Sequence, residues 1–172
     1  MDWTLRPATA ADDAFLLRVY AGTRADELAL TPWDDGQRSA FVRQQHQAQA
    51  VHYRMQCPDA ELSVIVARID GAPQDLGRLW LHRRADTVHV LDIALLAEWR
   101  GHGIGTACLA RLMQEATAGG RAVTIYVEAG NPARRLYERL GFVPTGEPQG
   151  VHQHMAWRPV MTASMEACDE QA

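Results

Sequence analysis

A glycine-rich turn that joins an apolar segment to an amphipathic one constrains the fold more than any other feature of the sequence. Both alternating sets of side chains in residues 87–95 are mostly apolar, as expected of a strand covered on both faces. Gly101, Gly103 and Gly105 follow, and glycine lets a backbone turn tightly and approach a ligand closely. Residues 104–118 then carry apolar side chains at helical spacing. A strand, a glycine turn and a helix in this order predict a site for a phosphate or pyrophosphate at the helix N-terminus.

The rest of the chain predicts a mixed sheet with helices on both faces. Segments with the apolar alternation of strands are separated by segments with helical spacing. Strands are expected over residues 2–6, 62–69, 77–82, 87–95, 123–127, 142–143 and 151–157, and helices after Thr9, over residues 37–56 and 104–118, and between Asn131 and Gly141. Adjacent strands combined with strand–helix–strand crossovers favour an α/β (α+β mixed) domain over residues 1–159. Residues 160–172 are acidic and lack apolar periodicity, so we expect a loosely ordered tail there.

The last expected helix has the clearest boundaries. Asn131 suits the capping position, Pro132 the first helical position and Gly141 the left-handed position after the end. Phe142 is then expected to pack back onto the helix, against Leu136 or Tyr137.

The absence of lysine excludes several kinds of enzyme. All 17 basic residues are arginine, which leaves no lysine for a Walker-type phosphate loop, a pyridoxal Schiff base or a general base. The net charge is −4 and there is no basic tract, so a nucleic acid partner is not expected. The turn has the pattern Gly-x-Gly-x-Gly, whereas dinucleotide binding favours Gly-x-Gly-x-x-Gly. A nucleotide-dependent enzyme stays open as an alternative that predicts thermal stabilisation by ATP or NAD and none by CoA.

Cysteine usage and hydropathy favour a cytoplasmic protein. Cys57, Cys108 and Cys168 are far apart and odd in number, which is typical of reduced thiols. Neither a signal peptide pattern nor an apolar run of the ~18 residues that span a membrane is visible. Cys108 lies on the apolar row of its helix, so we expect it in the core. His152 and His154 share a strand face without an evident third ligand, so no metal site is expected.

Two motifs resemble one known enzyme family. The first is Arg100-x-x-Gly103-x-Gly105 after the strand that contains residues 93–95, and it resembles the acyl-CoA motif of the GNAT superfamily of N-acetyltransferases. The second, Asn131-Pro132-Ala133-Arg134-Arg135-Leu136-Tyr137-Glu138-Arg139-Leu140-Gly141-Phe142, resembles the second motif of that family. The resemblance covers residues 87–142 in motifs and nearly the whole chain in element order. Ala97 departs from the family, in which many members have proline at that position.

The resemblance implies a fold and a co-substrate. The fold is a single GNAT-like domain whose mixed, mostly antiparallel central sheet splays between its fourth and fifth strands. Acetyl-CoA would bind there without a metal, with pantetheine along residues 93–95 and pyrophosphate on the amides of residues 101–106. The implied contacts are Ile93, Ala94, Leu95, Arg100, Gly101, His102, Gly103, Ile104, Gly105, Thr106, Asn131, Ala133, Arg134 and Tyr137. The family also implies that a homodimer is a frequent assembly.

The implied reaction needs an acid and a base. An alkyl ammonium has a pKa of roughly 10.4 and must lose a proton to attack a thioester, while an acid can protonate the departing thiolate. Tyr137 matches the family's motif tyrosine, although an aromatic that packs a helix on a sheet would look the same. The base candidates are His89, Asp92 and Glu128. Strand alternation places His89 and Asp92 on opposite faces unless a bulge intervenes.

Each base candidate also has a purely structural interpretation. Asp92 sits in an otherwise apolar strand and could form a salt bridge to an arginine. His89 could be a hydrogen-bonded histidine of a strand, and Glu128 could favour the helix N-terminus near Asn131.

The acceptor is expected to be a small cationic amine or a peptide amine. The region after the first helix contains acidic and aromatic residues that suit a cation, and we expect Glu27 and Trp33 to contact the acceptor. A non-catalytic acyl-CoA sensor with the same fold is the alternative from another functional class. Release of CoA thiol in the presence of an amine separates the two.

Overall fold

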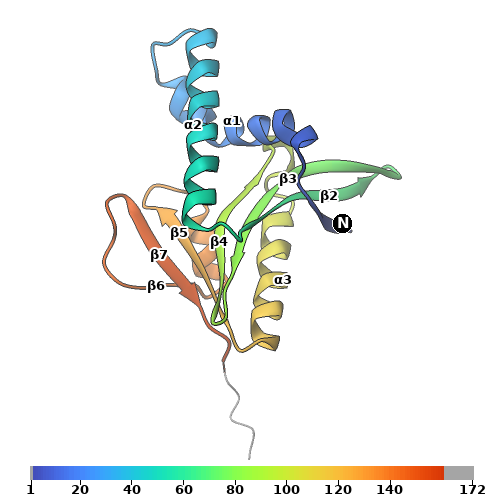
Figure 1. Ribbon diagram of the computed structural model, residues 1–172, viewed down its shortest axis with the longest axis vertical. Helices are drawn as coiled ribbons and strands as arrows, with labels where there is room; N and C mark the ends of the chain where they lie inside the picture. The colour runs from blue at the N-terminus through green and yellow to red at the C-terminus, as the bar shows by residue number, and fades with distance from the viewer. Residues whose placement is uncertain (1, 161–172) are drawn as a thin grey trace, which may run out of the picture.

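The computed structural model describes residues 2–160, which form a seven-stranded sheet between two pairs of helices (Figure 1). The strands are β1 (Trp3–Pro7), β2 (Glu61–Ile69), β3 (Ala72–Arg83), β4 (Thr87–Leu95), β5 (Ala122–Glu128), β6 (Val143–Pro144) and β7 (His152–Trp157). The helices are α1 (Asp13–Ala29), α2 (Asp35–Gln56), α3 (Ile104–Ala118) and α4 (Arg134–Arg139), with short 3-10 turns η1 (Ala10–Asp12) and η2 (Ala97–Trp99). The tail expected from residue 160 onward, and Cys168 within it, lie outside the described residues apart from Val160.

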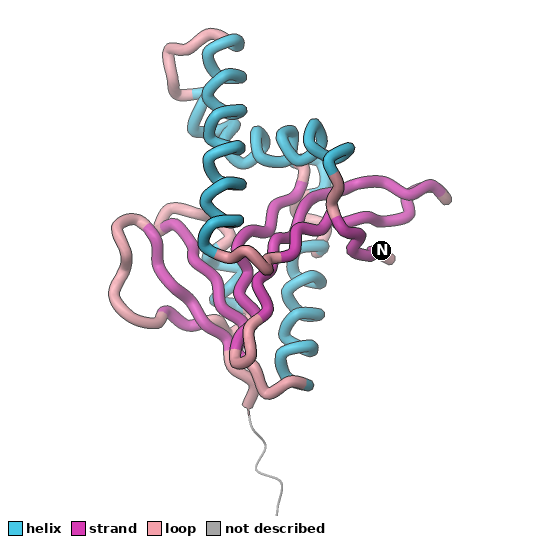
Figure 2. The backbone as a smooth tube through the Cα atoms, viewed as in Figure 1, coloured by secondary structure: helices cyan, strands magenta, loops and turns pink. Residues whose placement is uncertain are grey.

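The order of the strands is β1-β2-β3-β4-β5-β7-β6. Every neighbouring pair is antiparallel except β4 and β5, which run parallel and are joined through α3. Figure 2 shows how the strands fan out from the middle of the sheet while α2 crosses one face. The expected mixed, mostly antiparallel sheet is confirmed.

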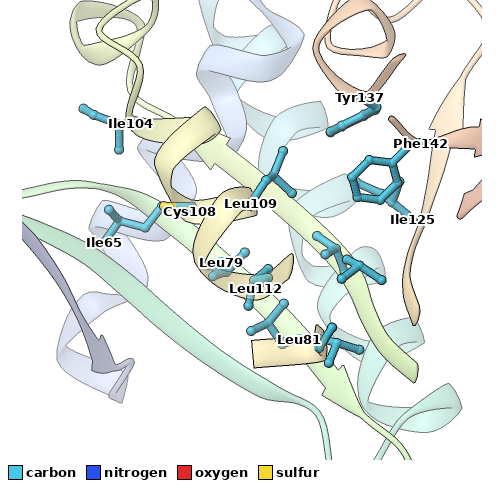
Figure 3. Close-up of a cluster of buried hydrophobic side chains, with 14 of the residues drawn as sticks. Ile65, Leu79, Leu81, Ile104, Cys108, Leu109, Leu112, Ile125, Tyr137 and Phe142 are labelled. Atoms are coloured by element: carbon cyan, nitrogen blue, oxygen red, sulfur yellow. The ribbon is translucent and has the colours of Figure 1, made fainter. Parts of the chain in front are cut away.

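The main core lies between the sheet and α3. Ile104, Cys108, Leu109 and Leu112 of α3 are buried against strand residues such as Leu79 (Figure 3). Cys108 is therefore a core residue, as its helical row predicts, and burial raises the pKa of its thiol to about 12. A thiol with such a pKa stays protonated at neutral pH and is a poor nucleophile.

The opposite face of the sheet carries α1 and α2. Val19 of α1 packs against Ala94 of β4, and Tyr53 of α2 packs edge-on against Trp80 of β3, with ring centroids 5.0 Å apart. The part of the chain from 2 to 160 contains no helix with the length and apolar character that crossing a membrane requires.

The sheet splits into a fork between β4 and β5. The two strands pair only from Thr87 to Val90 on β4 and from Ala122 to Ile125 on β5. Beyond Val90, β4 stays paired with β3 while β5 follows β7. The splay between the fourth and fifth strands is thus present, and it leaves one edge of residues 91–95 without a strand neighbour.

Close contact between backbones holds β4 on its other side. Gly77 of β3 lies opposite Leu95, and a Cβ at Gly77 would come 2.2 Å from the carbonyl oxygen of Ala94. Only glycine allows this approach, which keeps the free end of β4 tight against β3.

Candidate active site

The glycine loop presents a row of backbone donors at the N-terminus of α3. Gly101 and Gly103 have φ angles of 75° and 78°, and Gly103 is the N-cap of the helix. Among the described residues, the N–H groups of residues 101–106 have no hydrogen-bond acceptor. A Cβ at Gly101 or Gly103 would meet nothing within 4 Å, so the loop is open to a ligand. Converging amides and the helix dipole suit an anion such as a diphosphate.

Arg100 holds this loop in place. Its Nε donates to the carbonyl of Leu95 at 3.1 Å and its Nη2 donates to the carbonyl of Gly22 in α1 at 2.9 Å. The guanidinium therefore connects the loop to the end of β4 and to α1. In this arrangement Arg100 supports an anion site by fixing the loop in position. His102 Nδ1 lies 2.9 Å from the carbonyl oxygen of Arg100, which also stays within the loop.

The free edge of β4 lies beside this loop. Ile93 and Leu95 pack toward the α3 core, whereas Ala94 faces α1. Because the side chains are used for packing, the backbone of residues 93–95 is what the fork leaves available, as the sequence resemblance implies.

Tyr137 of α4 closes the α3 side of the fork. Its side chain is buried beside Phe142, with ring centroids 5.9 Å apart, in the same core as Leu109 (Figure 3). Burial, and then the charge of Asp92, raise the pKa of Tyr137 to about 12. The phenol is therefore protonated at neutral pH and can act as a hydrogen-bond donor.

The turn before α4 is built by the second motif. Asn131 Oδ1 accepts a hydrogen bond from the N–H of Ala133 at 2.9 Å, and Arg134 pairs with Glu138 at 2.9 Å. The expected N-cap at Asn131 and first helical position at Pro132 are wrong: the N-cap is Ala133, because the side-chain turn of Asn131 takes up the residues before the helix. Gly141 follows with a φ of 89°, as predicted.

A β-bulge at Leu91 changes which side chains share a face. Trp80 of β3 lies opposite Asp92, but the next residue, Leu81, lies opposite Val90. Leu91 is thus an extra residue, and alternation is interrupted there. His89 and Asp92 consequently both face α1 and α2, which resolves the alternative that the sequence left open.

Asp92 belongs to a buried polar cluster that sequence reasoning missed. Arg78 Nε donates to Asp92 Oδ2 at 2.7 Å and Arg78 Nη2 donates to Gln49 Oε1 at 2.9 Å. The Arg78 side chain is 2% exposed, and its guanidinium lies 5.5 Å from the ring centroid of Tyr20. The salt bridge to an arginine that the sequence suggested as a structural interpretation of Asp92 is present. A lone arginine within the apolar run of β3 was the signal that could have identified its partner.

His89 lies in the part of β4 that still pairs with β5, and its ring is close to those of Tyr126 and His154. Its Nδ1 is 2.7 Å from Thr124 Oγ1, and its ring centroid is 5.7 Å from that of Tyr126 and 6.4 Å from that of His154. Burial and then the positive charge of Arg84 lower the pKa of His89 to about 4. Its imidazole is therefore neutral at pH 7.

This depressed pKa predicts a pH-dependent stability. Unfolded His89 binds protons near its ordinary pKa of 6.5, so between pH 6.5 and 4 the unfolded state binds more protons than the folded state. His89 therefore lowers the free energy of unfolding only below pH 6.5, and this loss grows as the pH drops from 6.5 to 4. We expect urea unfolding of His89→Gln, which cannot take up a proton, to show a shallower pH dependence than wild type. An equal change of unfolding free energy with pH in the two proteins would contradict a lowered pKa of His89.

The remaining expected site residues lie in other surroundings. Glu128 Oε1, at the end of β5, is 3.6 Å from His152 Nε2. Glu27 pairs with Arg24 on α1 at 2.9 Å, and Trp33 packs on Phe41 with centroids 5.1 Å apart. The α1–α2 connection lies at the end of α2 that projects away from the sheet (Figure 1), and these contacts of Glu27 and Trp33 are with residues of α1 and α2. Residues 2–160 contain no group of three or more His, Cys, Asp or Glu side chains arranged to hold a metal ion.

Solved structures share this fold. PaiA N-acetyltransferase from Thermoplasma acidophilum, in complex with coenzyme A, is 17% identical over 92% of this chain and 100% of that one, with a TM-score of 0.66. YncA from Salmonella typhimurium, with its cofactor acetyl-CoA, is 21% identical over 96% of this chain and 99% of that one, with a TM-score of 0.54. At these identities the likeness establishes the fold.

Sequence comparison adds a family and a curated relative. Mycothiol acetyltransferase of Actinosynnema mirum is 39% identical over 77 residues, which are 43% of this chain and 26% of the relative. The chain therefore spans about a quarter of the length of that relative. The model of the Acetyltransferase (GNAT) family matches residues 26–142, which include the fork, the glycine loop and α4. The chain belongs to the GNAT acetyltransferase family.

Proposed function

We propose that this protein is an acetyl-CoA-dependent N-acetyltransferase that moves an acetyl group from the CoA thioester directly to a primary amine. The observation that carries the proposal is the row of N–H groups over residues 101–106, which lack acceptors among the described residues and lie beside the fork of the sheet. A diphosphate needs such converging donors, and the fork supplies a strand edge next to them.

The charge distribution favours an anionic ligand at this end of the fold. Residues 97–140 contain six arginines and four glutamates, whereas the whole chain has a net charge of −4. A CoA molecule would rest its diphosphate on residues 101–106, run its pantetheine along residues 93–95 and pass the turn at Asn131, Ala133 and Arg134. The open space around Gly101 and Gly103 fits this placement.

The reaction requires one hydrogen-bond donor near the sulfur of the thioester and another near its carbonyl oxygen, which becomes negatively charged during the reaction. When acetyl-CoA is bound, the amine nitrogen bonds to the acetyl carbon as the carbon–sulfur bond breaks, and CoA leaves as a thiolate. Tyr137 is protonated at neutral pH and can donate a hydrogen bond to that thiolate as it leaves. A backbone N–H near Leu95 can bond the carbonyl oxygen as charge develops, which typically contributes about 3 kcal/mol.

Asp92 is the base that the geometry supports best, acting on the amine through a water. Arg78 fixes one of its carboxylate oxygens, and Asp92 lies on the part of β4 that no longer pairs with β5. His89 is neutral and lies on the same face, and it is the second candidate. Glu128, the last residue of β5, is the third, and its Oε1 lies 3.6 Å from His152 Nε2 of β7.

The acceptor in this proposal is a small cationic amine or a peptide amine. A carboxylate and aromatic rings on the α2 face of the fork, in Asp92, Tyr126 and the cluster around them, would receive it. The names of the mycothiol acetyltransferase and PaiA N-acetyltransferase relatives support acetyl transfer as the reaction class.

A thiol-release assay tests the proposal against its alternative. The protein is incubated with acetyl-CoA and a panel of amines, free CoA is measured, and each amine is examined by mass spectrometry for an added acetyl group. We expect thiol release that depends on the amine, with stabilisation by CoA but not by ATP or NAD in thermal unfolding. Tight CoA binding without release for any amine would identify a sensor module of the same fold instead.

A further inference from the structure

Two side chains of α2 reach the free end of β4. Gln49 and Tyr53 are one helical turn apart and therefore project from the same side of the helix. The Tyr53 hydroxyl donates to the carbonyl oxygen of Leu91 at 3.0 Å, and Gln49 Oε1 accepts from Arg78. Neither contact belongs to the hydrophobic packing of α2, whose single buried residue is Val42.

The contact of Tyr53 falls where strand pairing fails. Leu91 is the bulged residue toward β3, and pairing with β5 ends at Val90. A backbone carbonyl in such a place lacks the partner that a strand neighbour would supply. The Tyr53 hydroxyl supplies it, and burial raises the pKa of that hydroxyl to about 12, so it stays a donor at neutral pH.

Gln49 is linked to Asp92 through Arg78. Arg78 bonds Gln49 with one nitrogen and Asp92 with another, and the ring of Tyr20 lies against its guanidinium. A guanidinium has a fixed planar arrangement of donors, so the position of Gln49 influences the direction of the Asp92 carboxylate.

We propose that Tyr53 and Gln49 are positioning residues for acetyl transfer, which fix the bulge of β4 and the Asp92 carboxylate in one orientation relative to the fork. This inference rests on the proposed function, because it assigns the two residues to that same site. It makes α2 a part of the catalytic geometry, although α2 donates no group to the reacting atoms. The glycine loop is held separately, by Arg100, so binding of CoA should not depend on Tyr53.

Tyr53→Phe tests this separation because it removes one hydroxyl and keeps the ring against Trp80. We expect kcat to fall about three- to tenfold, which corresponds to the loss of one ordinary hydrogen bond. The KM for acetyl-CoA and the Kd of CoA should stay within about twofold of wild type. Gln47→Ala, on the exposed side of the same helix, is the matched control and should leave kcat unchanged.

A measurement that does not depend on turnover and a second variant complete the test. The amide nitrogen of Asp92 shares a peptide group with the Leu91 carbonyl, so its resonance should move in Tyr53→Phe and stay fixed in Gln47→Ala. Gln49→Glu places a second carboxylate against Arg78, and we expect its kcat to fall at least as far as that of Tyr53→Phe, again with unchanged CoA binding.

The outcomes are distinguishable. Wild-type turnover together with an unchanged kcat in Tyr53→Phe and Gln49→Glu overturns this inference and leaves the proposed function standing. A joint fall of kcat, CoA affinity and Tm in both variants also overturns it, because that pattern marks a merely structural role. Absence of turnover in the wild type with every amine removes the proposed function and this inference with it.

Discussion

Tyr137→Phe will lower the maximal rate of acetyl transfer about a hundredfold while the Kd of CoA stays within about twofold of wild type. The variant keeps the ring that packs on Phe142 and loses only the hydroxyl. A hydrogen-bond donor aimed at developing charge typically contributes about a hundredfold or more, and burial raises the pKa of Tyr137 to about 12, which keeps the phenol a donor at neutral pH. The measurements are initial rates of thiol release at saturating acetyl-CoA and calorimetric titration of CoA.

The same variant separates chemistry from packing. Tm should stay near the wild-type value, since among the described residues no hydrogen bond from the Tyr137 hydroxyl is present and none is lost. A rate equal to that of wild type would remove Tyr137 from the mechanism. A fall in rate with an equal fall in CoA affinity would show that the residue shapes the binding site and does not act on the thiolate.

Gly103→Ala will weaken CoA binding at least tenfold, and Gly120→Ala will not. Both glycines have left-handed backbones, with φ of 78° and 61°, and a Cβ at either position would meet nothing within 4 Å. The two substitutions therefore carry a similar conformational cost, about 1–2 kcal/mol of stability. The two glycines lie at opposite ends of α3: Gly103 is its N-cap, and Gly120 follows its C-cap. Only the first change redirects the amides of residues 101–106.

Calorimetric titration of CoA and urea unfolding check this pair of variants. We expect similar losses of unfolding free energy in both and a loss of affinity in Gly103→Ala alone. Equal CoA affinity in the two variants would contradict the assignment of the loop to the diphosphate.

Local chemistry explains what the sequence could predict. Glycine spacing and the left-handed Gly141 act within a few residues, so the loop and the end of α4 are present as expected. Asn131 forms a local side-chain turn with Ala133, but the helix begins later than its predicted cap. Phe142 packs back on Tyr137 for the same reason. The mixed sheet follows from the order of strands and helices along the chain.

Contacts between distant residues explain what the sequence could not. The sequence around Leu91 gives no sign of a bulge, because the bulge is set by the pairing of β4 with β3. The shared face of His89 and Asp92 therefore could not be predicted. Arg78 bonds Asp92 from another strand. The direction of α2, which sets where the α1–α2 connection lies (Figure 1), could not be predicted either, and the expected roles of Glu27 and Trp33 stay predictions.

A CoA titration followed by amide NMR tests whether the glycine loop holds the diphosphate, because it reads the N–H groups of residues 101–106 one by one. The structure predicts that these resonances shift strongly with CoA, with the affinity that calorimetry gives, while pantetheine, which lacks the diphosphate, moves residues 91–95 and leaves the loop unchanged. Saturation with CoA that leaves the loop amides at their original positions would contradict the account.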